Sequence, residues 1–214
     1  MLAIMVKDIY QQRWLISGSI VLMLVLSVLI PAGSVIALAQ YPIILLVVIT
    51  VLVITLEGWE EKSKGYGFLS MLPISRAGVV AAKFLNLLLI TAVLSGVAAI
   101  AAAIQFGGTP MEALLPFILA LSGCAALALG ALTHSGMYLL GLARFTRVSL
   151  IAVMGVQLVA VGLGIRRYNL DRGVNPLAGM RDFLLPIDPV WFVITGVGIW
   201  LVLLAVTACF RKRI

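Results

Sequence analysis

The sequence predicts an all-α, polytopic membrane protein whose six transmembrane helices form a single transmembrane domain over residues 1–214. The first observation is composition, since 63% of the residues are hydrophobic and the mean hydropathy is +1.21. A soluble domain is roughly half apolar, so this chain has more apolar surface than one water-soluble core could bury. The second is that apolar runs of about 20 residues, enough to cross a hydrocarbon core about 30 Å thick, recur along the chain.

Six apolar runs are candidate spans, and short polar connections separate them. In chain order they are Trp14–Ile30, Tyr41–Leu56, Phe84–Phe106, Leu114–Leu132, Val148–Ile165 and Val190–Phe210. Pro42 falls in the first turn of the second run, where proline is tolerated. No strong helix breaker follows the fourth run before Leu142, so that helix can continue beyond Leu132. A cleaved signal peptide is the alternative for the first run, but its apolar stretch exceeds the roughly 7–15 residues of a signal core, which favours an uncleaved helix.

Residues 1–13 are expected to form an amphipathic helix that lies in the membrane interface before the first span. Apolar and polar side chains fall largely on opposite helical faces, with Leu2, Met5, Val6 and Ile9 on one and Lys7, Asp8, Gln11 and Gln12 on the other. Such a pattern is typical of helices that lie on lipid with one face buried among the acyl chains. Ile4 interrupts the polar face.

The lysines and arginines predict which side of the membrane each connection faces, because they concentrate in cytoplasmic loops. With six spans both termini share one side, and eleven of the fifteen basic residues fall on it: Lys7, Arg13, Lys62, Lys64, Arg76, Lys83, Arg144, Arg147, Arg211, Lys212 and Arg213. The other four lie in residues 166–189. Both termini and the connection 57–83 are therefore expected to be cytoplasmic, and residues 166–189 are expected to form an exterior loop. This loop could contain a short re-entrant or interfacial turn, or it could be a plain solvated loop with a buried hydrophobic turn. Asp188 is placed to cap the last span.

The scarcity of reactive groups argues against several function classes. All eight acidic residues lie in connections or at span ends, whereas an ion-driven transporter usually keeps an ionisable group in mid-membrane. The single histidine, His134, lies near the cytoplasmic end of the fourth span and is expected to be a hydrogen-bonded helix-end residue. There is no phosphate-binding G-x-x-x-x-G-K-[ST] stretch, no H-E-x-x-H pair and no G-x-S-x-G elbow. We therefore expect this chain to have no enzyme activity, no metal site and no cofactor of its own.

The connection 57–83 carries a concentration of charge that is unusual in a chain only 11% charged. Acidic residues leave the second span, lysines follow, and the loop then brings in apolar side chains: Tyr66, Phe68, Leu69, Leu72 and Ile74. Phe68, Leu69 and Leu72 would share one face of a short helix, which Pro73 ends. Ser75 is placed to cap the third membrane helix. The short helix could rest on lipid or dock into a groove of a cytoplasmic partner, and these residues alone do not separate the two.

The same connection resembles a known family. The residues are Glu61-Lys62-Ser63-Lys64-Gly65-Tyr66, then Phe68-Leu69-Ser70-Met71-Leu72-Pro73-Ile74-Ser75-Arg76, then Val79-Val80 and Lys83. They resemble the first cytoplasmic loop of the ATP-binding-cassette type-2 permeases, in particular the short bacterial six-helix permeases without an ATPase domain of their own. In that family an E-K-x-x-G-Y…L-x-x-L-P-[IV]-S-R segment joins the second and third spans and includes the coupling helix that touches the ATPase.

The resemblance implies a permease subunit of an ATP-driven exporter in the bacterial cell membrane, moving hydrophobic or amphipathic cargo such as a peptide, lipid or drug by alternating access. It implies a second permease subunit, identical or related, and separate cytoplasmic ATPase subunits that bind ATP and Mg²⁺; no nucleic-acid partner is expected. The expected ATPase-docking residues are Glu57, Glu60, Glu61, Lys62, Lys64, Tyr66, Phe68, Leu69, Leu72, Pro73 and Arg76. An ion-gradient-driven secondary transporter and a non-transporting membrane subunit are the alternatives. The cargo and the choice between homodimer and heterodimer stay open.

Overall fold

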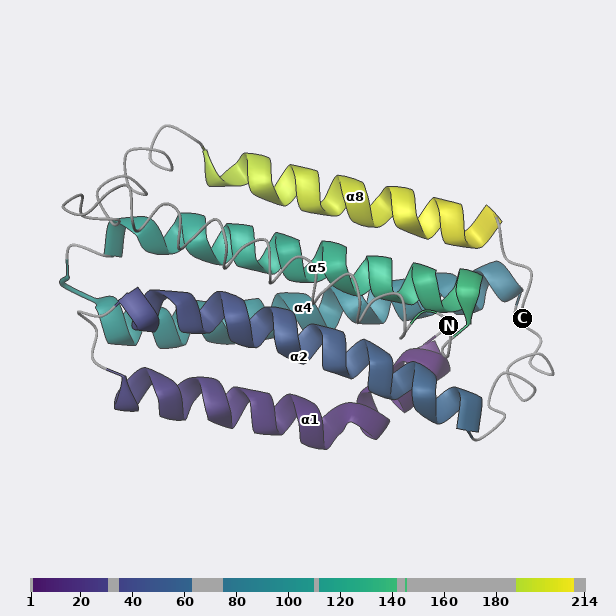
Figure 1. Cartoon of the computed structure of the whole chain (residues 1–214), viewed down its shortest axis with the longest axis horizontal. Helices are drawn as coiled ribbons and strands as arrows, with labels where there is room; N and C mark the ends of the chain where they lie inside the picture. The colour runs from purple at the N-terminus through teal and green to yellow at the C-terminus, as the bar shows by residue number, and fades with distance from the viewer. Residues whose placement is uncertain are drawn as a thin grey trace, which may run out of the picture.

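The computed structural model describes residues 2–30, 35–62, 75–109, 112–141, 145 and 188–209. Over these residues the chain is helical, in the order α1 (Leu2–Leu29), α2 (Val35–Lys62), α4 (Arg76–Phe106), the 3-10 turn η1 (Glu112–Leu114), α5 (Leu115–Leu140) and α8 (Pro189–Cys209). Figure 1 shows the long helices side by side along the longest axis of the molecule.

Five of the described helices are long and apolar enough to cross a membrane, which confirms an all-α, multi-span fold. They correspond to the first four and the last of the predicted spans. The remaining span, Val148–Ile165, and the exterior loop that follows it lie outside the described residues apart from Asp188 and Pro189, so the count of six stays a prediction.

The helix ends follow local chemistry that the sequence predicts. The Ser75 side chain accepts a hydrogen bond from the Gly78 backbone N–H at 3.1 Å, which confirms it as the N-cap of α4. Asp188 Oδ1 likewise accepts from the Val190 N–H at 2.9 Å at the start of α8. The fourth predicted span continues beyond Leu132 as expected, and α5 ends where Gly141 adopts a φ of 82°, in the left-handed region that favours glycine.

The N-terminal segment is helical as predicted, and its position in the membrane interface stays a prediction. Residues 2–13 are the first turns of α1 and are continuous with the first predicted span, and Figure 1 shows these turns bent away from the line of the remaining helix. Its polar residues Asp8 and Gln12 are buried, whereas its apolar residues Leu2 and Val6 are exposed. The polar side of the segment faces the protein, because oppositely charged and hydrogen-bonding groups of α2 lie there.

The helices pack closely through small residues. In Figure 1, α8 lies along one edge of the bundle and α1 along the other, with α5 packed between α8 and α2. A Cβ added at Gly196 of α8 would lie 2.6 Å from the Cβ of Cys124 on α5. A Cβ at Gly130 of α5 would lie 2.8 Å from side-chain atoms of both Ile49 and Leu87. The apolar core fills the space between these helices, since apolar side chains such as Leu45, Phe84 and Leu94 have no exposed surface.

A hydrogen-bond network ties three helices at the end of the bundle where α1 ends and α4 ends. Gln105 of α4 donates from Nε2 to the carbonyl oxygen of Ile30, at 2.6 Å. Its Oε1 accepts from Gln40 Nε2 at 2.8 Å and from the Tyr41 hydroxyl at 2.7 Å, both on α2. The network satisfies an otherwise unpaired carbonyl beyond the last turn of α1 and fixes α1, α2 and α4 to one another.

Candidate functional site

Ionisable side chains from four helices meet inside the opposite end of the bundle, where α2 ends and α4 begins. They are Lys7 and Asp8 of α1, Glu57 and Glu60 of α2, Lys83 of α4 and His134 of α5, which we call the charged cluster. Every member except Lys7 has no more than 2% of its surface exposed. Ionisable groups are almost never so deeply buried unless they are paired, so the pairs define this site.

Lys83 holds the centre of the charged cluster. Its Nζ lies 2.8 Å from Glu57 Oε1 and also donates to Glu60 Oε2. The two glutamates are three residues apart on α2, a spacing that places both carboxylates on one helical face. The Lys83 Nζ also lies 5.7 Å from the ring centroid of Tyr138 on α5, a favourable cation–π distance. One ammonium thus joins α2, α4 and α5.

Lys7 extends the cluster to α1. Its Nζ lies 2.7 Å from Glu60 Oε1, so Glu60 bridges Lys7 and Lys83 through its two oxygens. Lys7 also lies 3.4 Å from Asp8 Oδ1. Asp8 is fully buried, and neither of its carboxylate oxygens accepts a hydrogen bond. The first turns of α1 are therefore fixed to α2 by charge, which explains why their polar side faces inward.

His134 brings α5 and, through aromatic neighbours, α8 to the cluster. Its Nδ1 lies 3.0 Å from Glu57 Oε1, at ion-pair distance but without the alignment of a hydrogen bond. Its ring lies between those of Phe84, with centroids 5.8 Å apart, and Tyr138, with centroids 6.5 Å apart. Trp200 of α8 packs on Phe84 and donates from Nε1 to the Phe84 carbonyl oxygen at 3.2 Å. His134 thus lies near the end of α5 as expected, and it is buried beside a carboxylate.

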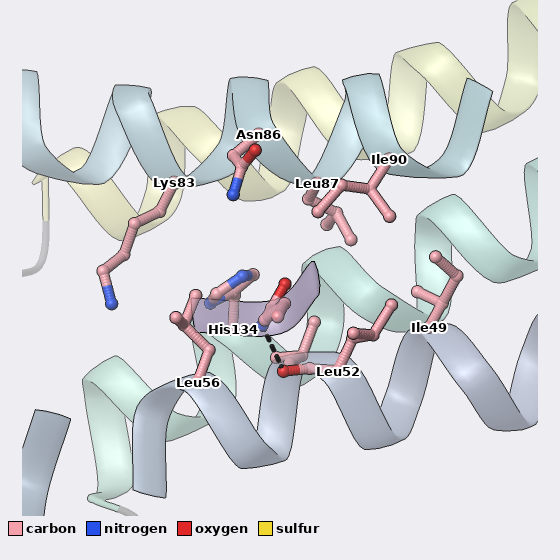
Figure 2. A pocket seen from close by; sticks show the side chains of 10 residues that line it. Ile49, Leu52, Leu56, Lys83, Asn86, Leu87, Ile90 and His134 are labelled. Carbon is pink, nitrogen blue, oxygen red and sulfur yellow. Dashed lines mark hydrogen bonds between the residues drawn. The ribbon is translucent and has the colours of Figure 1, made fainter. Parts of the chain in front are cut away.

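A small pocket adjoins the charged cluster between α1, α2, α4 and α5. Figure 2 shows apolar walls from α2 and α4, including Leu52, Leu56 and Leu87, with Lys83, Asn86 and His134 around the rest of the lining. Gln12 also lines it and donates from Nε2 to the Leu52 carbonyl oxygen at 2.7 Å. The pocket has room for about one water molecule.

Removing one partner of a buried ion pair leaves an uncompensated charge and is strongly destabilising, so the cluster fixes the relative positions of four helices. In the part of the chain that the structure describes, no three His, Cys, Asp or Glu side chains are arranged to hold a metal ion. The buried ion pairs therefore hold the ends of α1, α2 and α4, together with α5, to one another.

The sequence-predicted docking residues fall into three groups. Glu57 and Glu60 lie together in the charged cluster, buried within the bundle and not at an exposed rim. Glu61 and Lys62 are the last two residues of α2 and Arg76 is the first of α4, but their side chains are not described. The others, Lys64, Tyr66, Phe68, Leu69, Leu72 and Pro73, lie outside the described residues.

Sequence reasoning did not predict that Lys7, Asp8, Lys83 and His134 join the two glutamates. One signal was available: the positive-inside rule puts Lys7, Glu57, Lys83 and His134 at the same side of the membrane. It could not show that these side chains point inward, because only helix packing decides which face of each helix is buried.

Comparison with known proteins identifies the family. A family model described as "ABC-2 family transporter protein" matches residues 3–210, nearly the whole chain. Neither the search of curated proteins nor the search of solved structures finds a match. The match begins in α1 and ends just beyond α8, so all the described helices and the charged cluster lie within it. The chain is a membrane protein that belongs to the ABC-2 transporter family.

Proposed function

We propose that this chain is the permease subunit of an ATP-driven exporter and that the connection 57–83 docks on a separate cytoplasmic ATPase. The family match supports the role of permease, since ABC-2 permeases typically work with ATPase partners. The observation that carries the coupling role is the pairing of Lys83 with Glu57 and Glu60. These pairs join the two helices that flank residues 63–74, so a force on that segment reaches both helices at once.

In this proposal the docking contact is apolar at its centre and charged at its edge. Tyr66, Phe68, Leu69 and Leu72 enter a groove of the ATPase, and Pro73 ends the short helix that carries them. The edge is formed by Glu61, Lys62, Lys64 and Arg76, whose charges set the orientation of the partner. Glu57 and Glu60 are assigned a different role from the one expected from the sequence. Because they are buried, they attach the segment to the bundle and do not touch the ATPase.

The charged cluster connects the ends of α2 and α4, which flank residues 63–74, to α1 and α5. Glu60 connects to α1 through Lys7 and to α4 through Lys83, and Glu57 connects to α5 through His134. Two permease subunits, identical or related, would frame a pathway in a bacterial cell membrane with their termini in the cytoplasm. Approach of two ATPases on binding ATP would move these attached helix ends together and switch access from inside to outside. The cargo class that fits is hydrophobic or amphipathic, such as a peptide, lipid or drug.

The alternatives differ in what they predict for the purified chain. A secondary transporter would move cargo in proteoliposomes under an ion gradient, with no ATPase present. A non-transporting subunit would bind partners but support no flux. The exporter proposal predicts no flux from the chain alone and ATP-dependent flux when the ATPase is added.

The direct test is co-purification with a co-expressed candidate ABC-type ATPase. We expect the wild type to retain the ATPase in detergent and the double variant Leu69→Asp, Leu72→Asp to lose it while inserting normally. Ala113→Asp is the matched control, because Ala113 is exposed in η1 at the other end of the bundle. Docking through this segment would be contradicted if the double variant retained the ATPase, or if the control variant lost the ATPase as well.

A further inference from the structure

The outward side of the first turns of α1 carries apolar and aromatic side chains. Tyr10 is 63% exposed and Trp14 is 77% exposed, and Leu2 and Val6 are exposed as well. These four residues follow one another at intervals of four, so they form one stripe along the helix, which we call the outer stripe. The opposite side of the same turns packs on α2 and α4. The outer stripe therefore faces away from the described helices.

Arg13 places a cation beside the outer stripe. Its guanidinium carbon lies 4.1 Å from the ring centroid of Tyr10 and 5.5 Å from that of Trp14, so two aromatic rings hold the cation. Arg13 is exposed, and none of the ion pairs among the described residues involves it. A guanidinium oriented in this way keeps N–H donors for an oxyanion such as a phosphate.

The length of α1 puts Arg13 at the level of lipid headgroups. The helix has 28 residues, whereas about 20 suffice to cross the hydrocarbon core. Residues 14–29, which follow Arg13, include no charged side chain and extend about 24 Å at 1.5 Å per residue. With these residues in the hydrocarbon, Tyr10 and Trp14 fall where aromatic side chains concentrate in membrane proteins. The positive-inside rule predicts that this surface is the cytoplasmic one, whose leaflet carries anionic lipids.

Next to Arg13 in the direction of the hydrocarbon, α1 has space for an acyl chain. A Cβ added at Gly18 would meet no atom within 4 Å. Ser17 beside it is exposed, and Val21 continues the exposed surface with an apolar side chain. An acyl chain can therefore approach the helix backbone just below the cation. We propose that this side of α1 binds an anionic phospholipid, whose phosphate contacts Arg13 and whose acyl chain lies along Gly18 and Val21.

Charge favours this occupant over a second copy of the chain. The acid of α1, Asp8, is fully buried, so the exposed side of these turns offers a cation without an acid beside it. Two copies packed on the outer stripe around a two-fold axis would bring two Arg13 cations together, which is unfavourable. An anionic lipid instead matches the cation with its phosphate and the apolar surface with its acyl chains. The lipid would contact the same turns that the Lys7–Glu60 pair fixes to α2.

Quenching of Trp14 fluorescence by brominated lipids tests the site in the full chain. In the parent protein the exposed Trp59 and Trp191 are replaced by phenylalanine, and the signal of the buried Trp200 is measured separately in a Trp14→Phe variant. The vesicles are phosphatidylcholine with an increasing fraction of brominated phosphatidylglycerol or of brominated phosphatidylcholine. We expect the anionic lipid to quench Trp14 more strongly. Arg13→Gln should lower this preference by about fivefold, the loss expected for one arginine near an anionic surface.

The matched control is Ala113→Asp, which changes the net charge by the same amount at an exposed position in η1. It should leave the lipid preference at Trp14 unchanged. Quenching by phosphatidylcholine should persist in Arg13→Gln, which shows that the variant is folded in the bilayer. Equal quenching by the two lipids in the parent, or an unchanged preference in Arg13→Gln, would overturn the proposal.

Trp14 that neither lipid quenches would also overturn the proposal, because protein, such as a second copy of the chain, would then cover the outer stripe. The measurement involves no ATPase, so its outcome is independent of the docking experiment.

Discussion

Replacing Lys83 by methionine tests whether the buried ion pairs hold the bundle together. Methionine keeps most of the side-chain length but removes the ammonium, which leaves Glu57 and Glu60 buried without their shared partner. Removing one member of a buried pair typically costs about 3–5 kcal/mol, because the remaining charge is uncompensated. For a chain of this size each kcal/mol lowers the melting temperature by roughly 2–4 °C, so a fall of about 6–20 °C is expected.

The assay is reversible unfolding in mixed micelles, with the free energy of unfolding extrapolated to the absence of denaturant. A double-mutant cycle with Glu60→Gln separates the pair from other effects of each substitution. We expect the coupling energy to lie near the upper part of the range of about 0.5–3 kcal/mol seen for residues in contact. A Lys83→Met loss below about 1 kcal/mol, the value of an exposed ion pair, would refute the conclusion that these charges are buried and structurally important.

Three further predictions concern packing, hydrogen bonding and capping. Gly196→Ala should destabilise the protein by about 1–3 kcal/mol, because its new Cβ would lie 2.6 Å from the Cys124 Cβ. Gly198 on the same helix has open space around it, so Gly198→Ala should leave the free energy of unfolding nearly unchanged in the same assay. Gln105→Leu should lower the free energy of unfolding by roughly 1–3 kcal/mol, because it leaves Gln40, Tyr41 and the Ile30 carbonyl without their shared partner. The control, Ile104→Ala at the neighbouring position that is 73% exposed, should lower it by well under half of that. Equal losses of stability in the two variants would contradict the role of the network. Ser75→Ala should lower the free energy of unfolding by about 0.5–2 kcal/mol, and Ser75→Gly should lower it by only a few tenths of that unit. Amide hydrogen exchange in the first turn of α4 should be faster in the alanine variant than in the glycine variant. Equal exchange rates in the two variants would contradict the cap.

Much of the fold could be predicted because lipid imposes simple rules on a sequence. The apolar runs located five of the described helices, and Ser75 and Asp188 were identifiable as caps from their residue type and position. The first turns of α1 were harder. Their alternation of apolar and polar residues fits both an interfacial helix and a helix whose polar face is buried, and the choice depends on Glu60 and Leu52, which are far away in the sequence.

The site was less predictable than the fold for the same reason. Glu57 and Glu60 lie at the start of the charged connection. In the sequence, nothing distinguishes them from Glu61 as residues that could contact a partner protein. Three-residue spacing turns Glu57 and Glu60 together toward Lys83, whose ammonium pairs with both carboxylates inside the bundle. A histidine near a helix end is usually unremarkable, and His134 became informative only once Glu57 was found 3.0 Å from its ring.

The central claim, that the connection 57–83 couples this permease to an ATPase, is tested most directly by site-specific cross-linking. The two native cysteines, Cys124 and Cys209, are replaced by serine, and a single cysteine is introduced by Leu69→Cys or, as the control, Ala113→Cys. With a short bifunctional reagent in membranes that contain the ATPase, Leu69→Cys is expected to yield a permease–ATPase adduct and Ala113→Cys none. An adduct from Ala113→Cys alone, or no adduct from Leu69→Cys while the two proteins still support ATP-dependent transport, would contradict the claim.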